Sequence, residues 1–393
     1  MRILIVINGW VTEIGGAEKH IFEVTQYWKY GNEICFLLPI SGYDHAKDLR
    51  YQEKSLVGEA YVYSTPLEHE RSGSFKLVLL WILRILRTLF LPITGKFDVI
   101  VASSHLTSNI VPAVFLKKKK AAKMVVYVYH LVSPKENAKS FFEALSFVRE
   151  RIDLWLVQRY ADVVFVENTL VRNNLIGLGF NKNRIFLTCD GVDLEFIDNV
   201  SVDRKDTAYD ACFTGRLVRS KGIFDLISIW SNICKERPNS KLAIIGSGPE
   251  LENLRKKVKA LSLKKKVEML GFVPEEEKIR VMKASKVFMF PSYEEGWPLA
   301  ICEALACGNA VVAYDLPVYK EILDKAIKTV PVGNVEIFCK ATLEILRDEQ
   351  IRERMIADGH ELCRKYTWEG ASRNEMRILS LTINASNTKL GSK

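Results

Sequence analysis

The stretch PSYEEGWPLAICEALACG, residues 291–308, decides how the rest of the chain is interpreted. The β-branched and aromatic run Lys286–Phe290 before it predicts a strand. Pro298 stands where the first turn of a helix tolerates proline, and Gly308 is typical of a residue that ends one. The backbone N–H groups of Gly296–Leu299 would then lie free at a helix N-terminus, where the helix dipole and the unpaired donors favour a phosphate.

Two carboxylates flank this predicted anion site. Glu295 lies in the loop ahead of the helix, whereas Glu303 lies more than one turn inside it. The two carboxylates can therefore contact groups attached at opposite ends of the bound phosphate. A diphosphate with a sugar at each end fits that arrangement. A carboxylate at a helix start and an unrelated surface glutamate would give the same two residues.

The full pattern P-S-x-x-E-G-x-x-L-x-x-x-E-A-x-A-x-G resembles the nucleotide-sugar site of the retaining GT-B glycosyltransferases, the group 1 or family-four class. The resemblance is specific because it fixes many positions in a short stretch, which the spacing of two glutamates alone would not. It implies an α/β protein of the GT-B fold, with two Rossmann-like parallel-sheet domains facing across a cleft. It also implies sugar transfer from a nucleotide diphosphate to an acceptor hydroxyl, with retention at the anomeric carbon.

Length and composition favour two intracellular domains. A chain of 393 residues is too long for one ordinary core, and an apolar content of 48% excludes a disordered chain. The eight cysteines include no C-x-x-C pair, and the strand-like start Arg2–Ile7 does not resemble a signal peptide. We therefore expect buried, reduced cysteines and a cytoplasmic protein.

The net charge of +9 is concentrated in one segment. Between Arg71 and Lys123, lysines and arginines are opposed by a single acid, Asp98. A local basic excess on an otherwise balanced protein indicates an anionic partner in one place, either lipid head groups or nucleic acid.

A predicted helix over Lys76–Leu91 lies in this basic segment. Its polar residues share one arc of the helix, which leaves a broad apolar face. These polar residues are Lys76, Arg84, Arg87 and Thr88. The helix is too short and too charged for a good membrane span. It could lie in a membrane interface, with Lys117–Lys120 adding attraction to anionic lipid, or it could be a core helix beside a solvated turn of lysines.

The first domain begins with the strand Arg2–Ile7 and the loop Gly15-Gly16-Ala17-Glu18. The glycine spacing is not G-x-G-x-x-G, so it indicates a dinucleotide site only weakly. By the family resemblance, Gly15 and Gly16 belong to a loop that closes over the donor phosphates. A plain strand-to-helix turn is the alternative, and it stays open for Glu18.

Histidines at strand ends are candidates for the reacting centre. His130 ends the predicted strand Met124–Tyr129, and ligands of open parallel sheets bind outside the carboxyl ends of strands. The resemblance places a histidine of this kind near the reacting sugar, whereas a lone histidine is more often a packed or surface residue. His105, which also follows a strand, is the second choice. The remaining histidines are expected to be ordinary, and they are His20, His45, His69 and His360.

The motif Asp190-Gly191-Val192-Asp193 lies ahead of the predicted second domain. It resembles the N-G-V-D that precedes the interdomain linker of the family. The strand Asp210–Thr214 then leads into a loop that carries Arg216 and Lys221. Two cations held there could neutralise a diphosphate leaving group, the arginine with a bidentate fork and the lysine as a point charge. A solvated basic loop is the alternative.

We expect the acceptor-binding Rossmann-like domain over residues 1–195, a linker over 196–207 and the nucleotide-sugar-binding domain over 208–365. A C-terminal helix over 366–383 would cross back to the first domain, as the resemblance implies. Residues 384–393 would form a disordered tail.

The resemblance also assigns roles to the candidate residues. Arg216 and Lys221 would stabilise the leaving diphosphate. Glu303 would hold the ribose hydroxyls, Glu295 the hydroxyls of the donor sugar, and His130 a sugar hydroxyl or the reacting face. The remaining donor-binding residues are Gly15, Gly16, Gly246, Val273, Gly296, Trp297, Pro298 and Leu299.

The sequence therefore predicts a retaining glycosyltransferase of the hexosyltransferase type that needs no metal, since it has no D-x-D pair for manganese. Its donor would be a nucleotide diphosphate sugar and its acceptor a lipid-linked molecule or saccharide of cell-envelope glycolipid or polysaccharide synthesis. It would work in the cytoplasm or peripherally on the inner face of the cytoplasmic membrane. The alternatives are a nucleotide-sugar epimerase or sugar phosphorylase of the same fold, and a nucleic-acid-binding protein, for which a paired-glutamate diphosphate site has no use.

Overall fold

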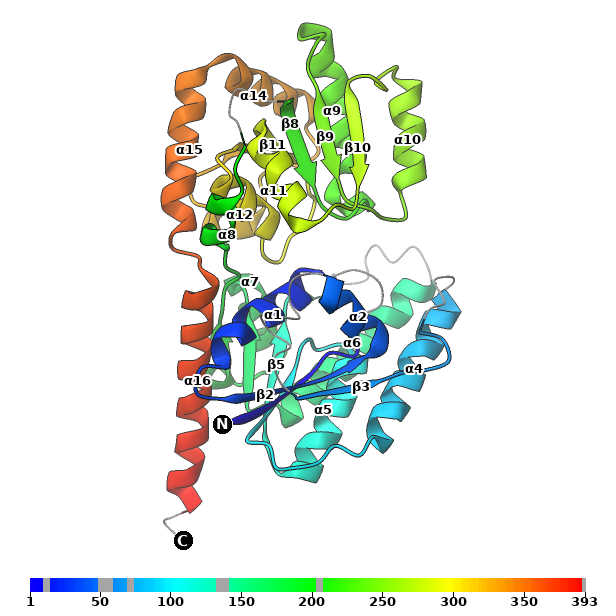
Figure 1. Cartoon of the computed structure of the whole chain (residues 1–393), viewed down its shortest axis with the longest axis vertical. Coiled ribbons are helices and arrows are strands. Elements are labelled where there is room, and N and C mark those ends of the chain that lie inside the picture. Colours follow the sequence, from blue (N-terminus) through cyan, green and yellow to red (C-terminus); the bar gives the residue numbers. More distant parts are fainter. Residues whose placement is uncertain (10–14, 49–58, 69–73, 132–140, 203–207, 391–393) are drawn as a thin grey trace. The chain divides into compact units, whose positions relative to one another are not determined.

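The structure is a computed structural model that describes residues 1–9, 15–48, 59–68, 74–131, 141–202 and 208–390 (Figure 1). The chain divides into two compact units. The first unit comprises Met1–Asp190 together with Trp368–Lys393, and the second unit comprises Gly191–Thr367.

The first unit is built on a parallel seven-stranded sheet. Its strand order is β3-β2-β1-β4-β5-β6-β7, so the direction of the order reverses between β1 and β4. The central strands are short apolar runs: β4 and β6 are buried at every residue, and β1, β2 and β5 at every residue but the first, as expected for a parallel sheet covered on both faces. The strands are β1 Arg2–Val6, β2 Glu33–Pro39, β3 Glu59–Tyr63, β4 Val99–Ala102, β5 Lys123–Val128, β6 Val163–Val166 and β7 Ile185–Leu187.

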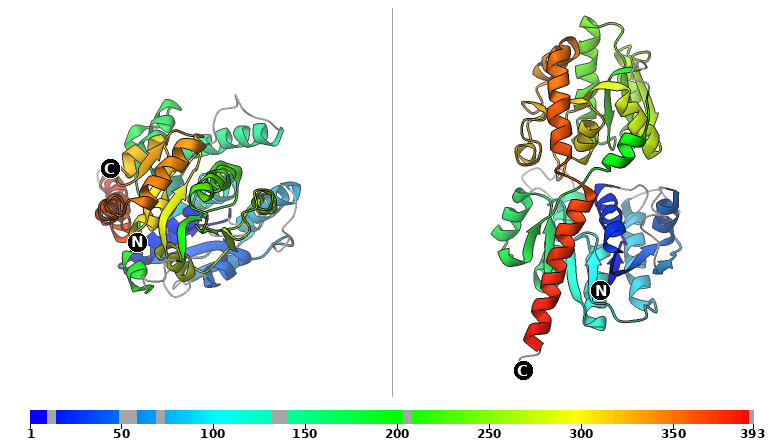
Figure 2. Two further views of the ribbon diagram at one scale, coloured as in Figure 1. Left: turned by 90° about the horizontal axis from the view of Figure 1, so that it is seen from above. Right: turned by 60° about the vertical axis from the view of Figure 1, so that its left-hand side comes forward.

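Helices link these parallel strands, and one helix joins the unit from the far end of the chain. That helix is α16, Trp368–Leu390, which packs against α1, Gly16–Trp28, as the two views of Figure 2 show. The other helices of the unit are α2 Ile40–Asp48, α4 Ser74–Phe90, α5 Thr107–Lys120, α6 Phe141–Tyr160 and α7 Thr169–Gly177.

The second unit is built on a parallel six-stranded sheet with the order β10-β9-β8-β11-β12-β13. The order reverses between β8 and β11, and open α/β sheets bind ligands at such a switch point. The strands are β8 Tyr209–Thr214, β9 Leu242–Ile245, β10 Val267–Gly271, β11 Ser285–Phe290, β12 Ala310–Tyr314 and β13 Lys328–Val330. The helices are α8 Leu194–Asn199, α9 Ile223–Glu236, α10 Leu251–Ala260, α11 Glu275–Lys283, α12 Leu299–Ala306, α13 Pro317–Ile322, α14 Val335–Arg347 and α15 Glu349–Cys363. Two parallel-sheet α/β units confirm the predicted fold class.

The expected linker and tail differ from the structure. The linker prediction of 196–207 begins inside α8, because the Asp193 carboxylate accepts a hydrogen bond from the Phe196 N–H (3.0 Å) and caps that helix. Ile197 of α8 is buried in the core of the second unit, and residues 203–207 lie outside the described ranges. The tail predicted over 384–393 is helical as far as Leu390, since no glycine or proline interrupts α16 between Gly370 and Gly391. Residues 391–393 are not among those described.

Helix α4 is oriented by a buried arginine. Arg84 donates to both carboxylate oxygens of Glu68, at 3.0 and 2.6 Å, and to the backbone oxygen of Asn8 at 3.0 Å. Arg84 and Thr88 are fully buried, whereas Lys76 and Arg87 are exposed. The predicted arc of polar residues therefore divides between the interior and solvent, because the buried Arg84 guanidinium needs carboxylate and carbonyl partners that only the interior offers.

Candidate active site

Loops from three neighbouring strands of the second unit meet at the switch point of the sheet. The loop after β8 contacts the loop after β11, where the Tyr293 N–H donates to the Ser220 oxygen at 2.8 Å. Gly222 has a φ of +64°, and a Cβ there would lie 1.7 Å from the Pro291 oxygen. Only glycine therefore allows these two loops to approach so closely.

The loop after β9 completes this edge. The Leu217 N–H donates to the Ser247 oxygen at 2.7 Å. Gly246, with a φ of +131°, would place a Cβ 2.0 Å from the Gly215 oxygen. The structure therefore brings the predicted Gly246 beside the loop of Arg216. Val273, just beyond β10, packs partly buried against the same core.

An ion pair links the two loops that the sequence singled out. The Lys221 ammonium lies 2.6 Å from a carboxylate oxygen of Glu295, and the lysine side chain stays 19% exposed while that of the glutamate is 6% exposed. The ammonium also lies 5.6 Å from the centre of the Phe290 ring. The residues expected on the diphosphate and on the donor sugar are thus in direct contact, and each fixes the position of the other.

A second ion pair holds the glutamate inside α12. The Glu303 carboxylate lies 2.7 Å from the Lys278 ammonium of α11, and Lys278 also lies 3.0 Å from Glu275. The sequence analysis did not single out Lys278. Its spacing of three residues from Glu275 is that of an ordinary pair on a helix surface, so no pattern in the sequence marks it as a site residue.

The start of α12 differs in detail from the prediction. Pro298 is the N-cap and the helix begins at Leu299, so the proline stands one position earlier than expected. The Leu299 N–H donates to the Trp297 oxygen at 3.0 Å. The row of free donors expected over Gly296–Leu299 is therefore wrong at two positions, since the local turn already uses the Leu299 N–H and Pro298 has no N–H.

Arg216 is the exposed cation of the site. It is the second residue after β8 and lies in the loop that carries Lys221. Within the described part of the chain, no hydrogen bond or ion pair engages its guanidinium, in contrast to Lys221. Its five donors are therefore available to an anion.

The predicted residues of the first unit lie beyond the carboxyl ends of its strands: Gly15 and Gly16 follow β1, and His130 follows β5. Gly15 is the N-cap of α1, and its N–H donates to the Glu18 carboxylate at 3.1 Å, so Glu18 closes the helix start. A Cβ on Gly16 would meet nothing within 4 Å, so packing does not require glycine there. His130 is exposed, and its ring centre lies 6.4 Å from that of His105. The first and second choices for the reacting histidine are thus neighbours.

One histidine expected to be ordinary is not. His20 is fully buried, and its two ring nitrogens lie 2.8 Å from Asp190 and 2.9 Å from Glu375. Burial alone lowers the pKa of His20, but the carboxylates of Glu375 and Asp190 outweigh it and raise the pKa to about 10. His69 lies outside the described residues, as does the side chain of His45.

The buried cluster around His20 includes a third carboxyl group. Burial and the charge of Asp190 raise the pKa of Glu167 well above its ordinary value. The Tyr127 hydroxyl donates to Glu375 at 2.9 Å, and the Thr188 hydroxyl donates to the same carboxylate. This His20 cluster consists of His20, Glu167, Asp190 and Glu375.

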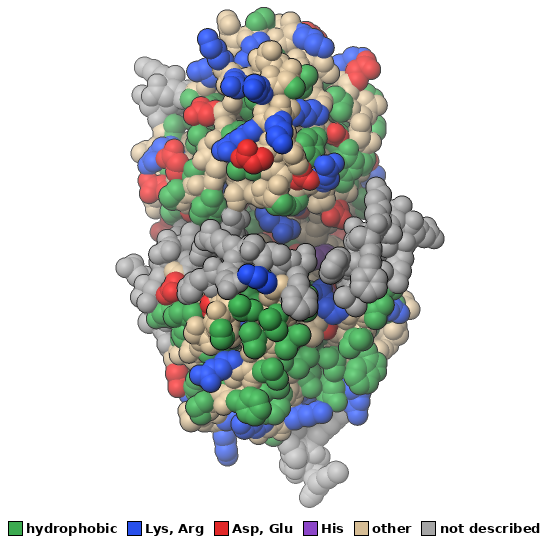
Figure 3. Space-filling view, turned by 90° about the vertical axis from the view of Figure 1, so that its right-hand side faces the viewer, with side chains coloured by type: hydrophobic (Ala, Val, Ile, Leu, Met, Phe, Trp, Pro, Cys, Tyr) green, Lys and Arg blue, Asp and Glu red, His purple; other side chains and the backbone are tan. Residues whose placement is uncertain are grey.

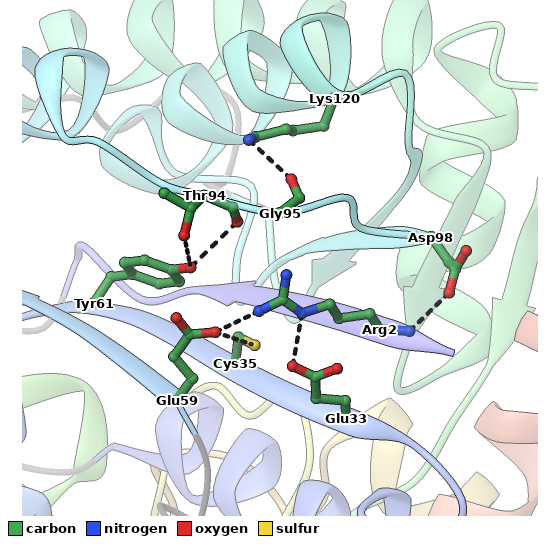
Figure 4. A network of polar contacts seen from close by, with 9 residues as sticks. All are labelled: Arg2, Glu33, Cys35, Glu59, Tyr61, Thr94, Gly95, Asp98 and Lys120. Atoms are coloured by element: carbon green, nitrogen blue, oxygen red, sulfur yellow. Dashed lines mark hydrogen bonds and ion pairs between the residues drawn. The ribbon is translucent and has the colours of Figure 1, made fainter.

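Two groups of described side chains are spaced closely enough to bind a metal ion. In each group a cationic side chain of the protein already pairs with the carboxylates. One is formed by His20, Glu167 and Asp190, where the imidazole bonds to a carboxylate through each nitrogen. The other is Glu33, Cys35 and Glu59 in the first unit (Figure 4). There Arg2 bonds to Glu33 at 2.7 Å and to Glu59. Both groups therefore have a structural explanation as ion pairs.

Comparison with known families accounts for most of the chain. The model described as "Glycosyltransferase Family 4" matches residues 14–196, and the model described as "Glycosyl transferases group 1" matches residues 197–362. The chain is therefore a glycosyltransferase, as predicted. It belongs to the group 1 and family 4 glycosyltransferases, and the epimerase, phosphorylase and nucleic-acid-binding alternatives are set aside.

Curated relatives span nearly the whole chain. A phosphatidylinositol N-acetylglucosaminyltransferase subunit of Arabidopsis thaliana is 22% identical over 398 residues, covering 99% of this chain and 84% of that protein. The phosphatidyl-myo-inositol mannosyltransferase of Mycolicibacterium smegmatis is 26% identical over 373 residues, covering 93% and 89%.

Solved structures confirm the GT-B fold. Anabaena HepE in complex with UDP and glucose has a TM-score of 0.75 at 16% identity, covering 97% of this chain and 99% of HepE. The sucrose-phosphate synthase of Thermosynechococcus elongatus has a TM-score of 0.77 at 17% identity, covering 98% and 99%. Across the described ranges, every helix is too short or too polar to cross a membrane.

Proposed function

We propose that this glycosyltransferase moves a sugar from a nucleoside diphosphate sugar to an acceptor hydroxyl, with retention at the anomeric carbon and without a metal ion. The observation that carries this proposal is the convergence of Arg216, the Lys221–Glu295 pair and the Lys278–Glu303 pair on loops and helices at one switch point. HepE, which shares the fold, was solved with UDP-glucose.

The two cations of the loop after β8 would promote departure of the diphosphate. Arg216 offers an unengaged guanidinium to the phosphates, and Lys221 offers an ammonium that Glu295 holds in place at 2.6 Å. Positive charge that is fixed before the reaction stabilises the developing charge of the leaving group at no cost of reorganisation. Such an arrangement supplies the charge that a divalent metal supplies elsewhere.

The glutamates would recognise the two ends of the donor. Glu303 lies inside α12, beside Lys278, and would accept hydrogen bonds from the ribose hydroxyls. Glu295 lies ahead of that helix and would accept them from the transferred sugar. Both carboxylates are already held by a lysine, so they need little ordering when the donor binds.

The transfer step needs no carboxylate nucleophile. The bond between the anomeric carbon and the diphosphate oxygen breaks, and its electron pair leaves with the diphosphate. The acceptor oxygen bonds to the anomeric carbon on the same face, and its proton passes to an oxygen of the leaving phosphate. His130 would contact a hydroxyl of the transferred sugar or the acceptor.

We further propose that the acceptor is lipid-linked or a saccharide of cell-envelope glycolipid or polysaccharide synthesis. The names of two relatives specify phosphatidylinositol-based substrates, which supports a lipid-linked acceptor. The enzyme would then work peripherally on the cytoplasmic face of the membrane.

A panel of nucleotide sugars tests the proposal. One donor is expected to raise the melting temperature of the wild-type protein in the presence of EDTA, and this shift should shrink in Arg216→Ala. Lys256→Ala, which removes an exposed lysine of α10 in the same unit, should keep the full shift. Proton NMR of the product should then show the anomeric configuration of the donor. No shift with any nucleotide sugar, a strict need for a divalent metal, or an inverted product would each overturn a named part of the proposal.

A further inference from the structure

Helix α4 presents its apolar side to solvent. Because Arg84 and Thr88 face inward, the opposite side of the helix carries exposed hydrophobic residues. Four of them repeat every fourth position and therefore lie on one side of the helix. These exposed residues are Val78, Leu79, Ile82, Leu86 and Phe90, and Phe90 is 80% exposed.

Two neighbouring helices extend this apolar surface. Helix α5 packs against both α4 and α6, and the Arg149 guanidinium of α6 lies 5.4 Å from the Trp81 ring of α4. Helix α6 exposes Val148, Ile152 and Trp155, whose spacing of four and three residues places them on one side. Helix α5 adds the exposed Phe115. Figure 3 shows hydrophobic side chains gathered on the first unit in this view, with lysines and arginines around them.

On these three helices the basic and the acidic residues differ in exposure. The exposed ones among the described residues are all basic, and they are Lys76, Arg87, Lys118, Lys119, Arg151 and Arg159. The acids of these helices whose side chains the structure describes are buried: Glu150 lies 3.3 Å from His105, and Asp153 accepts a hydrogen bond from the Thr107 hydroxyl at 2.7 Å. We call these exposed apolar and basic residues the three-helix face.

Only part of the lysine run belongs to this face. Lys117 bonds to Asp162 at 2.6 Å, and Lys120 donates to the Ile93 oxygen at 2.7 Å. The expectation that Lys117–Lys120 act together on lipid is therefore wrong for these two. Lys118 and Lys119 remain exposed, with their ammonium groups near the rings of Tyr160 and Phe115.

We propose that the three-helix face is a docking surface for an anionic lipid bilayer, with its apolar residues inserted among the head groups and its basic residues against lipid phosphates. An apolar centre whose exposed charges are basic wherever the structure describes the side chain has the composition of surfaces that lie in a membrane interface. The basic surround also argues against a second copy of this chain, because a symmetric contact would bring like charges together. The inference rests on the proposed function only for the location of the acceptor, and vesicle binding is measured without donor or acceptor.

Sedimentation of the full chain with vesicles tests this inference. Vesicles of phosphatidylcholine and phosphatidylglycerol in equal amounts should carry the protein into the pellet, and vesicles of phosphatidylcholine alone should carry much less. High salt should weaken binding, because surface charges are screened. Lys118→Gln/Lys119→Gln should weaken it on the order of tenfold or more, since each basic residue near an anionic surface contributes a factor of about five.

The apolar part of the face has a matched control. Ile82 and Ile152 are 48% and 56% exposed, whereas Ile337 and Leu261 of the second unit are 42% and 40% exposed. Ile82→Ser/Ile152→Ser should weaken binding on the order of tenfold or more, because inserted aliphatic side chains leave water. Ile337→Ser/Leu261→Ser should bind vesicles like the wild type. Lys256→Gln/Lys259→Gln, the control for Lys118→Gln/Lys119→Gln, should also bind like the wild type.

Three results would overturn the inference. The first is that the wild-type protein stays in the supernatant with anionic vesicles at low salt. Equal losses in the face variants and in their controls is the second. The third is a dimer in sedimentation velocity that Ile82→Ser/Ile152→Ser converts to monomer, since that would assign the face to a second copy. Retained donor binding in any of these cases would leave the proposed transfer reaction standing.

Discussion

The His20 cluster of the first unit and the lysine–glutamate pairs of the second unit both join cations to carboxylates, but they differ in how much of the cation solvent reaches. In the first unit, His20, Asp190 and Glu375 are almost completely buried, and a helix from the far end of the chain supplies Glu375. In the second unit, Lys221 and Lys278 keep part of their side chains in solvent at a sheet edge that loops surround.

The difference separates ions that stabilise the fold from ions that we propose bind a ligand. A closed cluster has its donors and acceptors matched internally, and removing one member leaves buried charge without a partner. An ion pair that solvent reaches can exchange its partner for a ligand, because neither charge would be left buried and unpaired. The unengaged guanidinium of Arg216 strengthens this assignment for the second unit.

The largest expected effect is on stability, in the closed cluster. His20→Leu leaves Asp190 and Glu375 buried without their cation, and it should lower the free energy of unfolding by about 3–5 kcal/mol. Urea unfolding followed by circular dichroism measures it. His130→Leu, at an exposed histidine, should change the value by less than about 0.5 kcal/mol. Equal small losses in both variants would remove the structural role of the cluster.

The next effect is on turnover, at the open pairs. Lys221→Ala and Arg216→Ala should each lower turnover on the order of 10²–10³-fold, as loss of one preorganised charge typically does. Their melting temperatures should stay near that of the wild type, because neither residue belongs to a core. Steady-state kinetics with the donor found in the panel measures this, with Lys256→Ala as the control. Near-normal turnover in both variants would remove the diphosphate assignment.

A third effect is the pH dependence of stability. A histidine whose folded pKa is raised from 6.5 to about 10 stabilises the protein fully below pH 6.5, and this stabilisation is lost as pH rises toward 10. The raised pKa of Glu167 acts in the same direction, because the folded state keeps a proton that the unfolded state releases. His20 alone should therefore lower the free energy of unfolding by about 1.4 kcal/mol for each pH unit between pH 6.5 and about 10. Urea titrations at a series of pH values measure this slope, and an undiminished slope in His20→Leu would contradict its assignment to His20.

The smallest effect is a division of labour between the two glutamates. Glu303→Ala should weaken the bare nucleoside diphosphate on the order of tenfold. Glu295→Ala should spare that ligand and weaken the intact nucleotide sugar by a similar factor. Calorimetry with both ligands on both variants measures it, and Glu252→Ala on α10 is the control. Equal losses for the two ligands in each variant would refute the division.

Much of the fold could be predicted from local pattern. The apolar runs of both units became parallel strands because such runs need burial on both faces, and Gly222 and Gly246 became loop residues because only glycine fits there. The motif around Glu295 and Glu303 likewise led to the correct family. The predictions fail where the partner of a residue lies far away in the sequence. Arg84 is an example, because its ion pair with Glu68 holds that side of α4 against the interior.

The sequence by itself determined the class of protein, the order of strands and loops along the chain, and the charged residues Arg216, Lys221, Glu295 and Glu303 as candidates for the site. Only the tertiary structure decided the partners: Lys221 meets Glu295 across 74 residues, and His20 meets Glu375 across 355. It also decided that the apolar side of α4 faces solvent. The physical reason is that apolar periodicity and glycine geometry act over a few residues, whereas a buried charge is stable only beside a counter-charge that the whole fold brings to it.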